Sequence, residues 1–174
     1  CQKAEVRPIW KEEAEKKDNW FIDAFMNDFQ WLHTDLNGTD FLYHGSTLHL
    51  PLIGVHQSLN VCTVLAVTEQ LKQKGCSIEI NHIKAGLEKV QFPARWEIVR
   101  KHPLIIIDGA HNQDGIDMLK ASVKQYLPNR TIVAVIGALR DKDTDYMVHA
   151  LADVFHHVIT ITPNNPRALD AKTF

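Results

Sequence analysis

Three short apolar runs in the second half of the chain alternate with two amphipathic segments, and this alternation limits the possible folds most strongly. The runs are 103–107, 131–136 and 158–162, and helical spacing covers 112–127 and 143–155. Because nearly every position of each run is apolar, a sheet with one solvated face does not fit them. The pattern predicts an α/β domain with a mostly parallel sheet covered on both faces. Three strands are few for such a sheet, so we expect an incomplete domain.

The first half of the chain has a different hydrophobic pattern. Alternating side chains predict two strands, 41–44 and 47–50, joined by a tight turn at Gly45-Ser46. Helical spacing follows in 56–74 and in 79–90. This half therefore predicts a small sheet followed by two helices.

Two further elements complete the prediction. Phe21, Phe25 and Phe29 are spaced by four residues and would form a core-facing stripe if 18–29 is helical. A strand is predicted at 96–99. The hydrophobic pattern changes between 93 and 102. This change divides the chain into a predicted first domain, 1–100, and a second, 101–174.

Composition excludes several classes of protein. The formal net charge is −2, so the chain has no electrostatic footprint for nucleic acid or an anionic membrane. No apolar run approaches the roughly 18 residues of a membrane span. The three cysteines form no CxxC pair, which predicts neither a disulfide framework nor a zinc site. We expect a cytoplasmic protein, and, because it opens at Cys1 rather than Met, a piece of a longer chain.

Polar clusters follow each predicted strand of the second half, at 108–112, 137–143 and 162–167. Ligands of open parallel sheets bind beyond the carboxyl ends of the strands. Asp108 is suited to sugar hydroxyls, and His111 to phosphate or carboxylate oxygens at the start of a helix. The alternative is that Asp108 and Asn112 serve only as turn and cap residues.

Two more candidates lie outside these clusters. Asn60, about one turn into a predicted helix, carries an amide that can both donate to and accept from a purine edge. Arg95, at the predicted domain junction, can hold phosphate oxygens with its planar fork. The alternatives are a solvated helix position for Asn60 and an ion pair with Glu97 for Arg95. Neither GxxxxGK[ST] nor GxGxxG occurs, so no phosphate-cradling loop is present, and neither HExxH nor GxSxG occurs.

Five motifs together resemble the later motifs of folylpolyglutamate synthases, which are relatives of the Mur ligases. In order they are PLIGVHQSLN (51–60), FPARWE (92–97), IDGAHN (107–112), Gly137 followed by Asp141-Lys142-Asp143, and NPRAL (165–169). The resemblance implies the end of a Mur-ligase-type central ATP-binding domain followed by a Rossmann-like glutamate-ligase domain. It also implies ATP-dependent ligation of L-glutamate to a folate, or to dihydropteroate, through an acyl phosphate.

Four positions carry roles over from the family. The resemblance makes Asn60 the adenine contact, Arg95 the phosphate contact and Asp108 a nucleotide-binding carboxylate. His111 would lie near the reacting phosphate or the incoming glutamate. Two positions depart from the pattern, because Ala94 stands where Gly is common and Gln113 where Pro is common.

The resemblance also sets limits. The family's phosphate-binding loop and its Mg²⁺ ligands would lie upstream of this chain, so we expect the chain alone to be inactive and to bind ATP weakly at most. We expect a monomer whose partners are ATP, glutamate and a folate or dihydropteroate. Two alternatives stay open: a Mur ligase that adds an amino acid to a muramyl peptide, and a non-catalytic α/β binding module.

Overall fold

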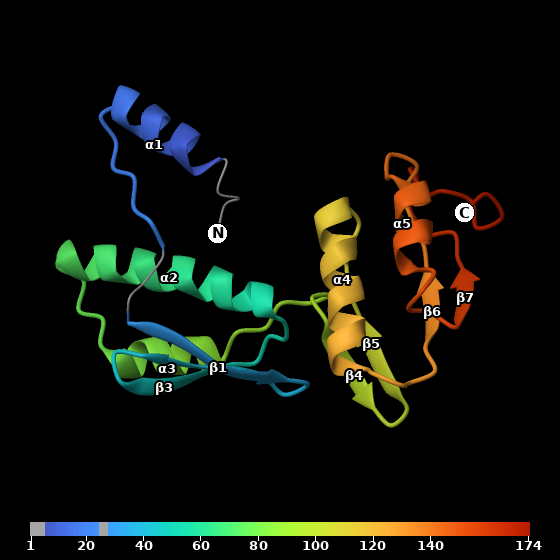
Figure 1. The fold of residues 1–174 in the computed structure, drawn as a ribbon, viewed down its shortest axis with the longest axis horizontal. Helices are drawn as coiled ribbons and strands as arrows, with labels where there is room; N and C mark the ends of the chain where they lie inside the picture. The colour runs from blue at the N-terminus through green and yellow to red at the C-terminus, as the bar shows by residue number, and fades with distance from the viewer. Residues whose placement is uncertain (1–5, 25–27) are drawn as a thin grey trace. The chain divides into compact units, whose positions relative to one another are not determined.

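The structure, a computed structural model, describes residues 6–24 and 28–174 and divides into two compact units, 1–91 and 92–174 (Figure 1). Unit 1 contains, in chain order, α1 (Arg7–Lys16), β1 (Phe29–Asp35), β2 (Gly38–Tyr43), β3 (Ser46–Leu50), α2 (Val55–Gln73) and α3 (Ile80–Glu88). Unit 2 contains β4 (Glu97–Lys101), β5 (Leu104–Ile107), α4 (Gln113–Tyr126), β6 (Val133–Ile136), α5 (Thr144–Leu151) and β7 (His157–Thr160).

Unit 1 is built on an antiparallel sheet in the order β1-β2-β3. Alternate side chains of β2 and β3 enter one core, which helices α2 and α3 complete: Phe41, Tyr43, Leu48, Leu50, Val61, Leu65, Ile83 and Leu87. The predicted hairpin and both predicted helices are confirmed. The hairpin turn is at His44 and Gly45, one residue earlier than predicted, and both have the positive φ (47° and 73°) that a two-residue turn favours.

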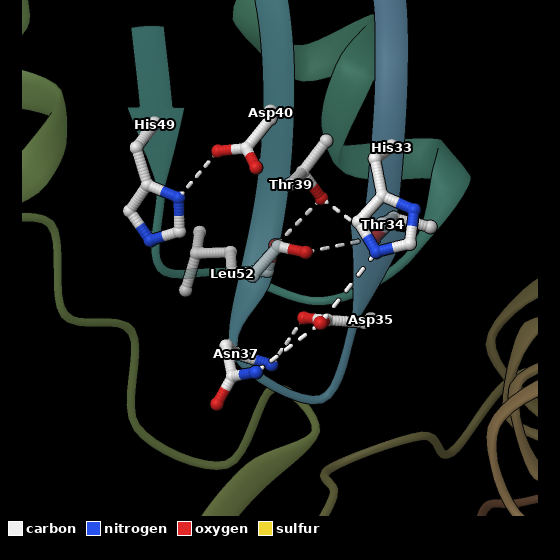
Figure 2. Close-up of polar contacts among 9 residues, drawn as sticks. His33, Thr34, Asp35, Asn37, Thr39, Asp40, His49 and Leu52 are labelled. Carbon is white, nitrogen blue, oxygen red and sulfur yellow. Dashed lines mark hydrogen bonds and ion pairs between the residues drawn. The ribbon is translucent and has the colours of Figure 1, made fainter.

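Buried hydroxyls connect this sheet to the loop that precedes α2 (Figure 2). The Thr39 hydroxyl is fully buried and donates to the Leu52 carbonyl at 2.9 Å. Thr34 Oγ1 lies 2.9 Å from the Thr39 hydroxyl and 3.1 Å from the Gly38 carbonyl oxygen. On the exposed side of the hairpin, His49 Nδ1 lies 2.7 Å from Asp40 Oδ1. The threonine network therefore fixes where the chain leaves the sheet toward α2.

The amino-terminal prediction is wrong. Residues 19–24 have no regular structure, and Phe29 begins β1 instead of ending a helix; Phe25 lies outside the described residues. Pairing with β2 decides the conformation of Phe29, whose ring lies 5.0 Å from that of Phe41. Helix α1 and strand β1 were not predicted.

Unit 2 confirms the order of strands and helices but not a mostly parallel sheet. β4 and β5 pair antiparallel, β6 and β7 pair parallel, and no described strand joins the two ladders. The short connection between β4 and β5 explains the first ladder, because strands joined by so few residues must run antiparallel. α4 and α5 contact each other, but Val135 (61%) and Ile159 (53%) are exposed, so the expected cover on both faces is also absent from the described residues.

Along the chain, the boundary between the two units falls between Gln91 and Phe92, so β4 lies in unit 2 with its partner β5. The assignment of 1–100 and 101–174 to an ATP-binding and a ligase domain stays a prediction. Within the described residues no helix is both long and apolar enough to cross a membrane.

Candidate functional site

Two turns of unit 2 are tied together by hydrogen bonds. The Gly109 amide donates to the Ala94 carbonyl at 2.8 Å, and the Trp96 amide donates to Asp108 Oδ2 at 2.8 Å. Asp108 Oδ1 accepts a third bond, from the Ala110 amide, at 2.8 Å. The turns meet because Glu97 at the start of β4 pairs with Ile107 at the end of β5. The sequence pattern thus places 94–96 beside 108–110.

Arg95 is presented at this junction. A Cβ atom at Gly109 would lie 3.5 Å from Arg95 Nη1, so the guanidinium lies within van der Waals contact of this position. The Arg95 Cζ atom lies 5.7 Å from the centre of the Phe92 ring, a cation–π contact. Among residues 6–24 and 28–174 no carboxylate forms an ion pair with Arg95, and Glu97 Oε2 instead accepts from the Ala94 amide at 2.8 Å. The exposed guanidinium is therefore available to an anion.

The backbone on both sides of Arg95 is left-handed. Ala94 has φ 55° and Trp96 has φ 49°, a region that residues with a Cβ adopt only at a cost. Trp96 is buried, with its ring 6.1 Å from that of Tyr126. Glycine is favoured at such a position, which gives the departure at Ala94 a physical meaning.

His111 and Asn112 follow Asp108 into the start of α4. His111 Nδ1 lies 2.7 Å from the Gly109 carbonyl oxygen. Asn112 is the N-cap of α4, and its side chain accepts from the Gly115 amide at 2.9 Å. The cap interpretation is confirmed for Asn112, and both carboxylate oxygens of Asp108 do bind turn amides. The exposed His111 makes no such contribution to the helix end.

A cavity of about 340 Å³ opens beside His111. Its lining comes from all three polar clusters that follow the strands, together with one residue of α5: Ala110, His111, Gly137, Ala138, Leu139, Lys142, Met147 and Arg167. Two backbone bonds, from Arg140 to Arg167 and from Leu169 to Ala138, both 2.9 Å, hold the second and third clusters together. The structure therefore brings these clusters to one place, as their position after the strands predicts.

The cavity carries basic groups. Lys142 Nζ lies 3.2 Å from Asp141 Oδ2, and Arg167 Nη1 lies 3.5 Å from Asp141 Oδ1. The hydrogen bond from Lys142, with Arg167 nearby, lowers the pKa of the Asp141 carboxyl. Lys142 and Arg167 offer two cationic groups against this one carboxylate, and His111, whose Nδ1 donates to the Gly109 carbonyl, adds its Nε2 edge. Such a cavity favours an anionic ligand.

Comparisons with known proteins agree with this geometry. The profile described as "Mur ligase, glutamate ligase domain" matches residues 94–174. The chain is 34% identical over 122 residues to the dihydrofolate synthase/folylpolyglutamate synthase of Bacillus subtilis, covering 70% of this chain and 28% of that protein. It is 37% identical over 126 residues to the folylpolyglutamate synthase of Lacticaseibacillus casei, covering 71% of this chain and 29% of that protein.

A solved structure of Mycobacterium tuberculosis folylpolyglutamate synthase, complexed with ADP and AMPPCP, superposes with a TM-score of 0.83 at 29% identity. That superposition covers 99% of this chain and 40% of the other. The chain belongs to the folylpolyglutamate/dihydrofolate synthase family. It spans less than half the length of the synthases that it matches.

Asn60, the fourth residue that resemblance to the synthases singled out, lies in unit 1. It is exposed on α2, and its Nδ2 donates to Gln57 Oε1 at 3.1 Å. The buried Gln57 in turn lies 2.9 Å from His56 Nε2. Arg95, Asp108 and His111 lie together in unit 2, whereas Asn60 stands in a separate group of polar side chains.

Three residues near the candidate site were not assigned from the sequence. Lys142 and Arg167 lay within quoted motifs, and the signal that could have found them is their positive charge after a predicted strand. Glu97 was considered only as an ion-pair partner of Arg95, and nothing in the sequence indicates its bond to the Ala94 amide. In the described part of the chain, no group of three or more His, Cys, Asp or Glu side chains is arranged to hold a metal ion.

Proposed function

We propose that the whole protein ligates L-glutamate to a folate, to dihydropteroate or to both, at the expense of ATP. In this proposal the chain supplies part of the nucleotide site and the site for the incoming glutamate. The observation that carries the proposal is the presentation of Arg95. Its guanidinium is exposed, free of carboxylate partners in the described residues, and placed against Gly109 beside a basic cavity. Family membership supplies the class of reaction.

ATP as the nucleotide is supported by the relatives and by the residues present. Related synthases have been solved with ADP and AMPPCP, with AMPPCP and folate, and with DHPP and ADP. Arg95 offers a planar fork for phosphate oxygens. Each Asp108 oxygen holds one amide and keeps a second lone pair for a ribose hydroxyl. We assign the adenine to Asn60.

We assign the incoming glutamate to the cavity lined by His111, Lys142 and Arg167. Its volume of about 340 Å³ is at the small end of ligand pockets, which suits one amino acid. Lys142 and Arg167 share the single carboxylate of Asp141, so a net positive charge is left for a carboxylate of the ligand, and His111 lies on the side of the Asp108 turn. A glutamate held there would present its amine toward the activated folate carboxyl. The amine nitrogen then bonds to the acyl carbon, phosphate departs with the electrons of the broken C–O bond, and the amine loses a proton.

The metal is different, because the described residues do not fit it. They contain no set of three possible ligands, so we route no step through Mg²⁺. Because the chain contains no GxxxxGK[ST] loop and spans less than half of its relatives, we propose that it does not turn over by itself and binds ATP weakly at most.

A ligation assay on the whole protein tests the proposal. Dihydropteroate, a reduced folate and a muramyl peptide are offered with ATP and labelled glutamate, and Arg95→Ala is run beside the unaltered protein. We expect ligation to at least one pteridine, with the KM for ATP raised at least tenfold by Arg95→Ala. Ligation only to the muramyl peptide would transfer the proposal to the Mur ligases, and no ligation to any acceptor would refute it.

A further inference from the structure

The turn that carries Arg95 depends on two carboxylates. Glu97 Oε2 accepts from the amide of Ala94, before Arg95, and Asp108 Oδ2 accepts from the amide of Trp96, after it, both at 2.8 Å. Arg95 is thus flanked by two hydrogen bonds to carboxylates. Such bonds are stronger than those between neutral groups.

The backbone of this turn needs such support. Ala94 and Trp96 are both left-handed, with φ 55° and 49°, and Trp96 is a bulky residue for which this conformation is rare. Residues keep such conformations only where their surroundings hold them. The buried Trp96 indole holds one side of the turn, and the bond from Gly109 to the Ala94 carbonyl holds the other. Glu97 closes the turn locally, three residues from the amide that it binds.

We propose that Glu97 and Asp108 are positioning residues, which hold the turn 94–96 so that the Arg95 guanidinium stays against Gly109. For Asp108 this is a role beyond nucleotide contact, and Glu97 gains a role of its own. The inference rests on the proposed function in one respect, namely that Arg95 binds the phosphates of ATP.

Charge and position predict opposite results at Glu97. If Glu97 acted by its negative charge near the phosphate site, its removal would strengthen ATP binding. If it positions Arg95, its removal must weaken ATP binding although a repulsive charge is lost. Glu97→Gln keeps a carbonyl oxygen that can accept the Ala94 amide, whereas Glu97→Met removes the acceptor at similar size.

The experiment measures KM for ATP, KM for glutamate and kcat of the whole protein. We expect Glu97→Met to raise the KM for ATP about tenfold with a smaller change for glutamate, and Glu97→Gln to stay within about threefold of the unaltered protein. Glu88→Met, the same change at an exposed glutamate of α3, is the control. Adding Ala94→Gly to Glu97→Met should recover part of the loss, since glycine adopts the left-handed conformation freely.

A structural readout on the 174-residue chain accompanies the kinetics. Hydrogen exchange of the Ala94 amide should become faster in Glu97→Met, while amides of α4 keep their protection. The inference would be overturned if Arg95→Ala raised the KM for ATP but a folded Glu97→Met protein had an unchanged or lower KM for ATP. If Arg95→Ala itself left the KM unchanged, the phosphate contact of the proposed function would be the part that failed.

Discussion

The two units hold their shape in different ways. In unit 1, Phe41, Tyr43 and Leu65 are completely buried in one core between the sheet and two helices. In unit 2, strand side chains such as Val135 stay exposed, and the turns around Arg95 are held by hydrogen bonds of 2.8 Å. Apolar packing therefore determines the fold of unit 1, whereas a few polar contacts determine the candidate site of unit 2. Mutations in the two units should differ accordingly.

The largest effect is expected in the core of unit 1. Leu65→Ala removes a fully buried side chain from α2 and leaves a cavity, which costs about 2–5 kcal/mol of unfolding free energy. Val64→Ala, at the neighbouring position with 52% exposure, should cost less than about 1 kcal/mol. Urea unfolding followed by circular dichroism measures both. Equal losses of unfolding free energy at the two positions would show that burial in the core of unit 1 does not determine the cost of a substitution.

The substitution Thr39→Val tests whether the stability of unit 1 also depends on a polar contact. Valine keeps the shape of the side chain but removes the hydroxyl, so the Leu52 carbonyl loses its donor and Thr34 loses its neighbour. We expect a loss of about 1–3 kcal/mol, smaller than that of Leu65→Ala. Thr39→Ser keeps the hydroxyl and serves as the control. If valine were tolerated better than serine, the network in Figure 2 would add nothing to stability.

In unit 2 the informative change goes from alanine to glycine at two sites. Ala94→Gly should stabilise the unit by about 1 kcal/mol, because φ is 55° there. Ala121→Gly, on an exposed face of α4, should destabilise it by about 1 kcal/mol, because glycine is a poor helix former. The same substitution thus has opposite signs within one unit. Hydrogen exchange of α4 amides measures both changes in the stability of unit 2. If both substitutions destabilised the unit, the turn at Ala94 would not be strained.

Local patterns allowed most elements to be predicted. The alternation around Phe41 and Leu48 identified the hairpin, and the spacing in 56–74 identified α2, because burial of one face imposes these periods. The prediction for Phe29 was wrong, because its spacing of four from Phe25 fits a helix face, whereas pairing with β2 decides its conformation. The apolar run at Ile105–Ile107 identified a strand and not its partner, because composition does not encode pairing direction.

The candidate site could be proposed from residue types, but its contacts could not be predicted. Arg95, Asp108 and His111 could be chosen from chemistry and from resemblance to a family. Nothing in the sequence indicates that Asp108 Oδ2 binds the Trp96 amide, because that bond forms only when β4 and β5 pair. The bond from the Ala110 amide to Asp108 Oδ1 is local, and it fits the turn role that the sequence offered for Asp108.

The smallest expected effect concerns a surface ion pair of unit 2. Asp153 lies 2.9 Å from both Lys120 and Lys124 of α4. Hydrogen bonds from Lys124 and then Lys120 lower the pKa of the Asp153 carboxyl from 3.8 to about 2. Because the folded pKa is the lower one, the contribution of Asp153 to stability is present above pH 3.8 and is lost as pH falls toward 2. The groups are exposed, so salt should weaken the effect.

Carbon-detected NMR titration of the Asp153 carboxyl measures this pKa directly. Replacing both lysines, Lys120→Met with Lys124→Met, should return the pKa toward 3.8, while Lys101→Met on β4 should leave it unchanged. If the carboxyl of the unaltered chain titrated near 3.8, the contact between Asp153 and α4 would not persist in solution. Polar contacts at the surface of unit 2 would then differ from those at the Arg95 turn, where the bonds hold a strained backbone.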